Sequence, residues 1–184
     1  MNVEDLYLSY LDTVKSLGIS ESTMLLCASI TSQKLYLLKK GKSVKEYVMS
    51  SSRRPPSCKE NSLGTPWGLH EICEKIGEGE GLGMVFEGRK SIGMTHSECN
   101  EEKRAKNLIT TRILRLKGLQ VGVNQGDGVD SFDRYIYIHG TNHEDRLGLP
   151  SSSGCLQLSN SDVLELHDNV NEGTHLWIEK IAND

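Results

Sequence analysis

The sequence lacks cysteines in paired C-x-x-C spacing, and it has no long apolar run. Its five cysteines are scattered singly, at Cys27, Cys58, Cys73, Cys99 and Cys155. Because structural zinc sites use closely spaced cysteine and histidine ligands, such a site is poorly supported. No apolar segment approaches the roughly 18–20 residues that a membrane-spanning helix needs, so we expect no transmembrane segment.

Basic residues are also in short supply. Lys and Arg number 21 against 25 Asp and Glu, which gives a formal charge of −4. This mild acidity lacks the positive footprint of a nucleic-acid-binding protein, so no nucleic-acid partner is expected. The segment 1–20 has no basic stretch before a continuous apolar run, and it is therefore not a secretory signal. Either the protein acts where it is made, or a signal has been removed from this sequence.

The residues that are present suit one globular domain rich in strands. Its 184 residues fall within the usual range of about 100–200 per domain, and 36% of them are hydrophobic. Glycine, with 18 residues, exceeds the usual share of about 7%, whereas aromatic residues make up only 5%. This composition favours many turns and strands around a modest core. We predict a mainly β fold with a few short helices.

The hydrophobic spacing predicts an amphipathic helix over residues 3–17, with Gly18 as its C-cap. This helix belongs to an N-terminal segment, 1–20, and the remaining domain is expected to span 25–181. Further strands are expected at 24–30, on both sides of a turn at 39–42, and at 83–88, 110–119, 134–138 and 175–181. A second helix is expected after residue 158, with Ser159 or Asn160 as its N-cap.

Cys155 differs from the other cysteines in its neighbours. It follows Gly154, and a glycine beside a thiol lets the backbone turn sharply and aim consecutive N–H groups at one point. Acyl transfer needs that geometry, because its tetrahedral intermediate carries a negative oxygen. An ordinary thiol, with a pKa of about 8.5, is mostly protonated at neutral pH and needs a base. His139 lies 155 − 139 = 16 residues upstream, at the end of a predicted strand, and is the candidate base. The alternative is that Cys155 fills the core and His139 caps the strand.

A metal site near His139 is disfavoured. His139 and His143 are four residues apart, which would place both on one face of a helix. A helix is not expected there, because a strand pattern precedes His139 and Gly-Thr-Asn follows it. No Glu stands at the second position of this spacing, so we expect neither a metal ion nor another cofactor. A further histidine, His167, is expected on the solvated face of the second helix.

Two C-terminal segments carry a more specific pattern: IHGTN and, after a loop, LGLPSSSGCLQLSNSDVLELHDNVNEGTHLWI. This pattern resembles the catalytic end of the L,D-transpeptidase (YkuD-like) family, in which His-Gly-Thr-Asn follows a strand and a loop ends in Ser-His-Gly-Cys-hydrophobic-Arg. Upstream, ITSQKLYLLKKGKSVKEYVMS and GTPWG are similar to the family's opening hairpin and strand entry. The resemblance covers about 25–181.

The resemblance implies a β-sandwich that transfers acyl groups on peptidoglycan stem peptides, in cell-wall cross-linking or remodelling. Cys155 would be the nucleophile and His139 the general base. The positions that match the family's motif are Cys155, His139 and Gly140 for the reaction, Ser152, Ser153 and Gly154 around the oxyanion hole, and Asn142 and Gln157 for substrate binding. The family's location implies the cell envelope, whereas the absence of a signal leaves a cytoplasmic protein open.

Three activities remain open on this resemblance. An amine that resolves the acyl-enzyme would make the protein a transpeptidase. Water would make it an L,D-carboxypeptidase, acting on stem peptides or on recycled muropeptides. The third possibility is a catalytically impaired module that binds peptidoglycan.

The sequence departs from the family pattern at two positions. The family's His before Gly-Cys is Ser153 here, and its Arg two residues after the cysteine is Gln157. The missing Arg removes a fixed cation that could bind a substrate carboxylate bidentately. His139 is retained, which is compatible with activity. The insertion 77–104 is expected either to form a lid or to be a surface excursion.

Overall fold

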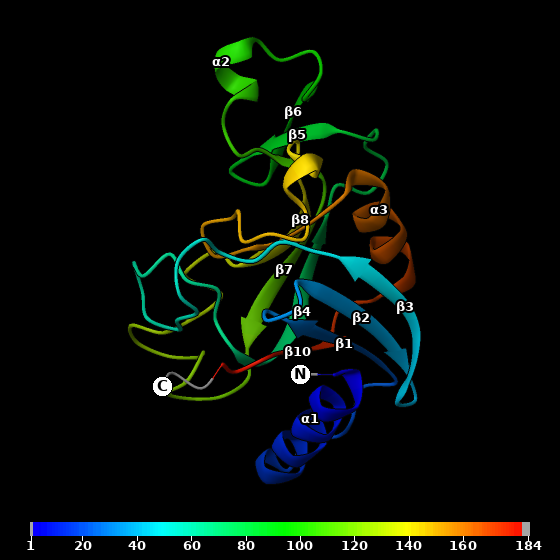
Figure 1. Ribbon diagram of the computed structural model, residues 1–184, viewed down its shortest axis with the longest axis vertical. Coiled ribbons are helices and arrows are strands. Elements are labelled where there is room, and N and C mark those ends of the chain that lie inside the picture. The colour runs from blue at the N-terminus through cyan, green and yellow to red at the C-terminus, as the bar shows by residue number, and fades with distance from the viewer. Residues whose placement is uncertain (1, 182–184) are drawn as a thin grey trace.

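The computed structural model describes residues 2–181, which form a mixed β-sheet with a few helices (Figure 1). The helices are α1 (Val3–Leu17), α2 (Glu101–Arg104) and α3 (Asn160–Asn169), with a 3-10 turn, η1, at Glu144–Arg146. The strands are β1 (Met24–Ser29), β2 (Lys34–Lys39), β3 (Lys42–Val48), β4 (Gly68–Ile76), β5 (Met84–Glu87), β6 (Lys90–Thr95), β7 (Ile109–Gly118), β8 (Tyr137–Gly140), β9 (Leu156–Leu158) and β10 (His175–Ile178). The predicted fold class, mainly β with an N-terminal helix, is confirmed.

The sheet branches at β7 and curls back on itself. Its main path runs β3-β2-β1-β10-β4-β7-β5-β6, and β8 pairs with both β7 and β9. Thr110 of β7 pairs with β5 on one side and with β8 on the other. The chain after β3 runs beside β9 and the segment before it, where Ser50 bridges Gln157 and Ser52 bridges Ser152. The β3 end of the sheet therefore meets the branch that ends in β9, and the curled sheet encloses the main core as a sandwich does.

Two apolar clusters hold the sheet and helices together. The main cluster lies inside the curled sheet and includes Leu26, Leu114, Ile138, Leu156 and Leu166. The second lies between α1 and the outer face of β1, β10 and β4, and it includes Leu6, Tyr10, Val14, Leu25, Leu69 and Trp177. In Figure 1, α1 and the β5–β6 hairpin stand at opposite ends of the molecule.

Helix α1 has the boundaries that the hydrophobic spacing predicts. Asn2 caps its N-terminus by accepting a hydrogen bond from the Asp5 N–H, 2.9 Å away. Gly18 ends it at φ 67°, in the left-handed region that glycine adopts without strain. The polar cap at one end and the glycine at the other explain why the helix stops where it does.

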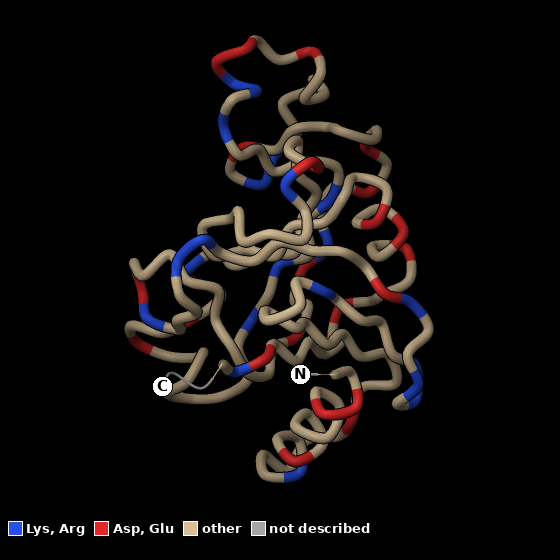
Figure 2. The backbone as a smooth tube through the Cα atoms, viewed as in Figure 1, with Lys and Arg blue, Asp and Glu red and all other residues tan. Residues whose placement is uncertain are grey.

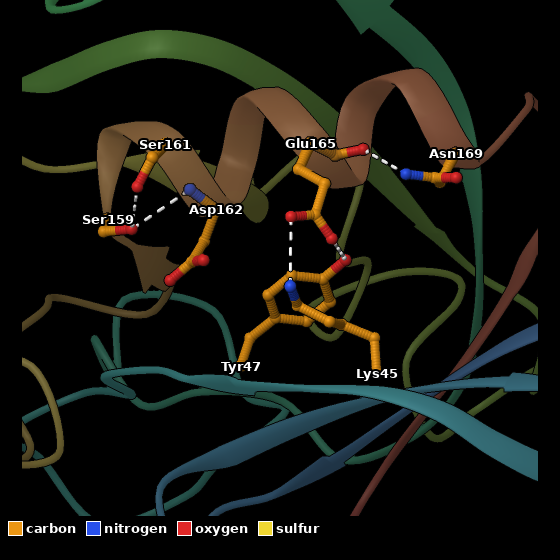
Figure 3. A network of polar contacts seen from close by, with 7 residues as sticks. All are labelled: Lys45, Tyr47, Ser159, Ser161, Asp162, Glu165 and Asn169. Carbon is orange, nitrogen blue, oxygen red and sulfur yellow. Dashed lines mark hydrogen bonds and ion pairs between the residues drawn. The ribbon is translucent and has the colours of Figure 1, made fainter.

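Helix α3 is fastened to β3 by polar contacts, which Figure 3 shows. Glu165 accepts hydrogen bonds from the Tyr47 hydroxyl at 3.2 Å and from Lys45 Nζ at 3.1 Å. Ser159 is its N-cap and accepts from the Asp162 N–H at 3.0 Å. These contacts fix the helix immediately after β9.

The strand predicted at 134–138 begins later than expected, at Tyr137. The chain before it turns, because the Arg134 N–H donates to Asp130 O at 3.0 Å and the Ile136 N–H to Ser131 O at 3.1 Å. Tyr135 adopts φ 55°, far from the φ of about −120° to −140° of regular β-strands. The side chains at 134–138 are typical of a strand, but the N–H groups of Arg134 and Ile136 form hydrogen bonds within the turn and so cannot pair with a neighbouring strand.

Acidic and basic residues are interspersed along the described chain (Figure 2). Among the helices of residues 2–181, none combines the length and the hydropathy needed to cross a membrane.

Candidate active site

The strand pair β8–β9 places His139 and Cys155 on one face of the sheet. The strands are parallel, with His139 opposite Gln157 and Ile138 opposite Leu156. Cys155 immediately precedes β9, and because side chains alternate along a strand, extending that alternation by one residue assigns Cys155 to the side of Gln157 and His139. Ile138 and Leu156 point the other way, into the main core. Cys155 and His139 are therefore diagonal neighbours on the face turned away from that core.

The Cys155 thiol lies in mostly apolar surroundings. It is half-buried and packs against a cluster formed by Phe86, Ile113 and Tyr137. Its Sγ donates to Tyr135 O at 3.6 Å. Burial raises the pKa of the thiol to about 11, although the Tyr137 N–H and the Arg134 cation act in the opposite direction. The thiol is neutral at neutral pH, so a base must remove its proton when sulfur attacks.

The His139 imidazole is held in one tautomer. The side chain is only 4% exposed, and its Nδ1 lies 2.7 Å from Gly140 O. A carbonyl oxygen can only accept, so Nδ1 carries the hydrogen and Nε2 has the lone pair. Burial lowers the pKa of His139 to about 4, which keeps the ring neutral. His139 thus has the protonation state that a general base requires.

Ser152 shapes the loop before Cys155. Its hydroxyl donates to Cys155 O at 2.6 Å and accepts from the Gly154 N–H at 3.2 Å. Gly154 has φ 130°, and a Cβ there would lie 3.2 Å from Ile136 Cδ1. Only glycine suits that backbone. Ser153, where the family pattern has His, is exposed.

Gly140 allows β8 to approach its neighbours closely. A Cβ at this position would lie 2.7 Å from Thr110 O and 3.0 Å from Asn160 Oδ1. Any side chain would push β8 away from β7 and α3. Since Gly140 O also orients the imidazole, such a shift would move His139.

Asn142 and Gln157, the candidate substrate-binding residues, both hold the segment that returns from the insertion. Asn142 Nδ2 donates to Arg104 O at 2.8 Å and to Lys106 O at 3.1 Å. Gln157 is 2% exposed; its Nε2 donates to Asn107 Oδ1 at 3.1 Å, and its Oε1 accepts from Ser151. The side-chain amides of Asn142 and Gln157 are therefore hydrogen bonded within the protein.

The insertion packs over the face that carries Cys155, and we call residues 77–104 the cover segment. Phe86 of β5 lies in the apolar cluster around Cys155. At the hairpin turn, Arg89 donates to the Tyr137 hydroxyl at 3.2 Å and lies over the Tyr135 ring, 5.3 Å from its centroid. These contacts favour a lid over a surface excursion.

Sequence reasoning missed three residues of this face: Phe86, Arg89 and Tyr137. Tyr137 could have been found, because it lies two residues before His139 on a strand and so shares its face. Phe86 and Arg89 reach the site because the hairpin of the cover segment packs beside β8; the strand pattern at 83–88 predicts a strand but not where it packs. A separate cavity of about 760 Å³ is lined by Trp67 and Trp177, among others, and includes neither Cys155 nor His139 in its lining.

Comparisons with known proteins identify the family and the fold. The family model of the L,D-transpeptidase catalytic domain (YkuD) matches residues 23–178. No curated protein matches the sequence.

Several solved structures are similar in fold. An L,D-transpeptidase from Mycobacterium smegmatis is 16% identical with a TM-score of 0.52, and the match covers 86% of this chain and 59% of that one. L,D-transpeptidase 3 from Mycobacterium tuberculosis, in complex with a faropenem-derived adduct, is 14% identical with a TM-score of 0.54, covering 86% and 61%. An L,D-transpeptidase from Xylanimonas cellulosilytica is 16% identical with a TM-score of 0.52, covering 91% and 68%. The chain thus spans about three fifths of the two mycobacterial structures.

Proposed function

The chain belongs to the L,D-transpeptidase catalytic-domain (YkuD) family, and from this premise we propose that it is a cysteine acyltransferase of peptidoglycan stem peptides. Cys155 is the nucleophile and His139 the general base. The observation that carries the proposal is the fixed tautomer of His139, whose Nδ1 is bonded to Gly140 O while Cys155 shares its face.

The first half-reaction forms a thioester. Cys155 Sγ attacks the carbonyl carbon that joins an L-centre to a D-centre in a tetrapeptide stem, and its proton passes to His139 Nε2. The tetrahedral intermediate collapses, the carbon–nitrogen bond breaks, and the terminal D-amino acid leaves with the proton from His139. The acyl group stays on sulfur.

The second half-reaction releases the acyl group. His139 Nε2, again neutral, accepts a proton from the incoming amine as its nitrogen attacks the thioester carbonyl. An amide forms, and Cys155 regains its proton from His139. Phe86, Ile113 and Tyr137 form apolar surface beside the thioester, which supports transfer to an amine over hydrolysis.

The two departures from the family pattern bear on substrate binding. Gln157 brings no charge to the position of the family's Arg, and Ser153 brings no imidazole. Arg89, in the cover segment beside Tyr137, supplies a cation above the same face. We infer that Arg89 of the cover segment contributes to binding a substrate carboxylate. Because peptidoglycan is the proposed substrate, the proposed place of action is the cell wall.

The test is intact-mass spectrometry of the full chain after incubation with a disaccharide-tetrapeptide. We expect a covalent acyl adduct and loss of the terminal D-alanine in the wild type, and neither in Cys155→Ala. Cys73→Ala is the matched control, because Cys73 is also a half-buried free cysteine, and it should behave as the wild type.

The products separate the alternatives. A cross-linked dimer identifies a transpeptidase, and a free tripeptide identifies a carboxypeptidase. Stem-peptide binding without an adduct by the folded wild-type protein would overturn the catalytic proposal in favour of a binding module.

A further inference from the structure

A second cluster of titratable residues lies away from Cys155, where the end of α3 meets the loop after β4. Glu78 belongs to this loop, and His167 and Asp168 to the last turn of α3. His167 Nδ1 lies 3.5 Å from Glu78 Oε2 and 3.6 Å from Asp168 Oδ1. One ligand atom from each of the three residues falls within 4.8 Å of the others.

His167 is a buried histidine. Its side chain is 1% exposed, which corrects the sequence-based expectation that it is solvated. Neither ring nitrogen has a hydrogen-bond partner among residues 2–181. Buried polar groups in folded proteins are nearly always paired, so an imidazole buried with both nitrogens unpaired needs an explanation.

The distances to the two carboxylates suit a shared metal ion better than hydrogen bonds. Donor–acceptor distances for N–H···O bonds are about 2.7–3.2 Å, well below those seen here. Zinc–nitrogen and zinc–oxygen bonds are about 2.1 Å, so two ligand atoms of a tetrahedral ion lie about 3.4 Å apart. The observed separations of 3.5 and 3.6 Å are close to that tetrahedral edge.

We propose that Glu78, His167 and Asp168 form a binding site for a divalent transition-metal ion, of which Zn²⁺ fits the ligands best. An imidazole nitrogen selects Zn²⁺ over the oxygen-seeking Mg²⁺ and Ca²⁺. Two carboxylates balance the charge of the ion, and water completes the tetrahedron. This proposal departs from the sequence-based expectation of no metal ion, because 167 − 78 = 89 residues separate two of the ligands and no local motif joins them.

Two cations lie near the cluster and are held by other partners. Lys75 Nζ donates to Val170 O at 2.8 Å. Arg112 Nη1 donates to Glu80 O at 2.9 Å and to Thr111 O at 2.7 Å. Both cations are directed to backbone carbonyls, and neither forms an ion pair with Glu78 or Asp168 within the described residues.

The ion would join α3 to the root of the cover segment. Helix α3 is held on β3 through Glu165 (Figure 3), and this contact restrains the helix that carries His167 and Asp168. Glu78 follows Gly77, where the chain passes beneath the Phe86 ring; a Cβ on Gly77 would lie 2.8 Å from Phe86 Cζ. Binding of the metal ion would therefore restrain the loop at the start of the cover segment.

The experiment is a Zn²⁺ titration of the full chain by isothermal calorimetry, with thermal unfolding as a second readout. We expect one ion per chain and a rise in melting temperature. Glu78→Gln and Asp168→Asn should each weaken binding by at least about tenfold, the lower end of the loss caused by changing a residue that only orients a metal ligand. Both side chains are largely exposed, at 81% and 64%, so these variants should fold.

Controls separate this site from others. Glu80→Gln, two residues along the same loop, should bind Zn²⁺ as the wild type does. Co²⁺ bound in place of Zn²⁺ should give a visible spectrum without thiolate-to-metal charge transfer, because no cysteine is a ligand. Absence of binding, unchanged binding in both carboxylate variants, or a thiolate band would overturn the proposal. None of these readouts depends on acyl transfer.

Discussion

Three histidines are buried among residues 2–181, and they differ in how many ring nitrogens are hydrogen bonded. His70 of β4 has both bonded, to Gly68 O at 3.0 Å and to Ser131 Oγ at 2.9 Å. His139 of β8 has only Nδ1 bonded, to Gly140 O. His167 of α3 has neither nitrogen bonded. The number of open nitrogens matches the role that we propose for each: His70 as a structural crosslink, His139 as a base with one open nitrogen, and His167 as a metal ligand.

Burial alone does not distinguish these three regions. It lowers the pKa of His70 and of His139 to about 4, and it also lowers the pKa of His167. All three rings are therefore neutral at neutral pH. What separates a functional histidine from a structural one in this fold is the set of neighbours, because only an open nitrogen can take a proton or a metal ion.

The largest effect should come from exchanging the base. His139→Gln removes the nitrogen that accepts the thiol proton, and we expect acylation of Cys155 by a tetrapeptide stem to slow by about 10²–10⁴-fold. Time-resolved intact-mass spectrometry measures this rate.

His70→Gln is the matched variant, since it removes an equally buried histidine that has no open nitrogen. Its folded fraction should acylate at the wild-type rate, although the protein should unfold at lower denaturant concentration. If acylation slows equally in both variants, its rate depends on the loss of a buried histidine and not on the loss of an open nitrogen.

The second effect is acid destabilisation. The unfolded-state pKa of histidine is about 6.5, whereas His70 and His139 have folded-state pKa values of about 4. Between these values the unfolded chain binds more protons, so the free energy of unfolding falls as pH falls from 6.5 to 4. Each histidine should account for about 3 kcal/mol over that window, measured by urea unfolding at several pH values.

His70→Gln sharpens this result. Its unfolding free energy should depend less steeply on pH, by about 1.4 kcal/mol per unit, because one proton-binding difference is gone. A wild-type stability that stays constant between pH 6.5 and 4 would contradict the neutral state of both rings.

The third effect concerns the thiol beside the base. Because the pKa of Cys155 is about 11, its alkylation by iodoacetamide should rise about tenfold per pH unit between 7 and 9, without a plateau. Peptide mass mapping gives the rate at each cysteine, with Cys73 as an internal reference. A plateau already reached below pH 7 would indicate a thiolate–imidazolium pair.

The sequence predicted the elements whose amphipathic pattern is long. The spacing over residues 3–17 matched α1 at both ends, and Ser159, one of two candidate caps, proved to be the N-cap of α3. The motif around Cys155 and His139 indicated the family, which the family model confirms. The catalytic roles of the two residues stay predictions.

Other features depend on contacts that no local pattern reports. The aromatic run at 134–138 has the side chains of a strand, but hydrogen bonds to Asp130 and Ser131 turn its first half. Asn142 and Gln157 stand at motif positions, yet the segment that returns from the cover occupies their amides. The partners of a side chain follow from tertiary folding, as they do for His167.

The smallest effect should come from Arg89, which links the cover segment to Tyr135 and Tyr137. Arg89→Ala removes a hydrogen bond to the Tyr137 hydroxyl and a contact with the Tyr135 ring. We expect the KM for the stem peptide to rise about fivefold while kcat changes by less than about twofold, since no reacting atom is touched. Steady-state kinetics of D-alanine release measures both.

Lys90→Ala is the control, because Lys90 is exposed in the same turn and should leave both constants unchanged. An equal fall in kcat and in kcat/KM for Arg89→Ala would mean that the guanidinium contacts the transition state. In that case the cover segment would contribute a catalytic group, and the open nitrogen of His139 would not be the only reactive feature of this face. If only KM changes, the cover segment helps to bind the substrate and takes no part in the proton transfer that we propose for His139.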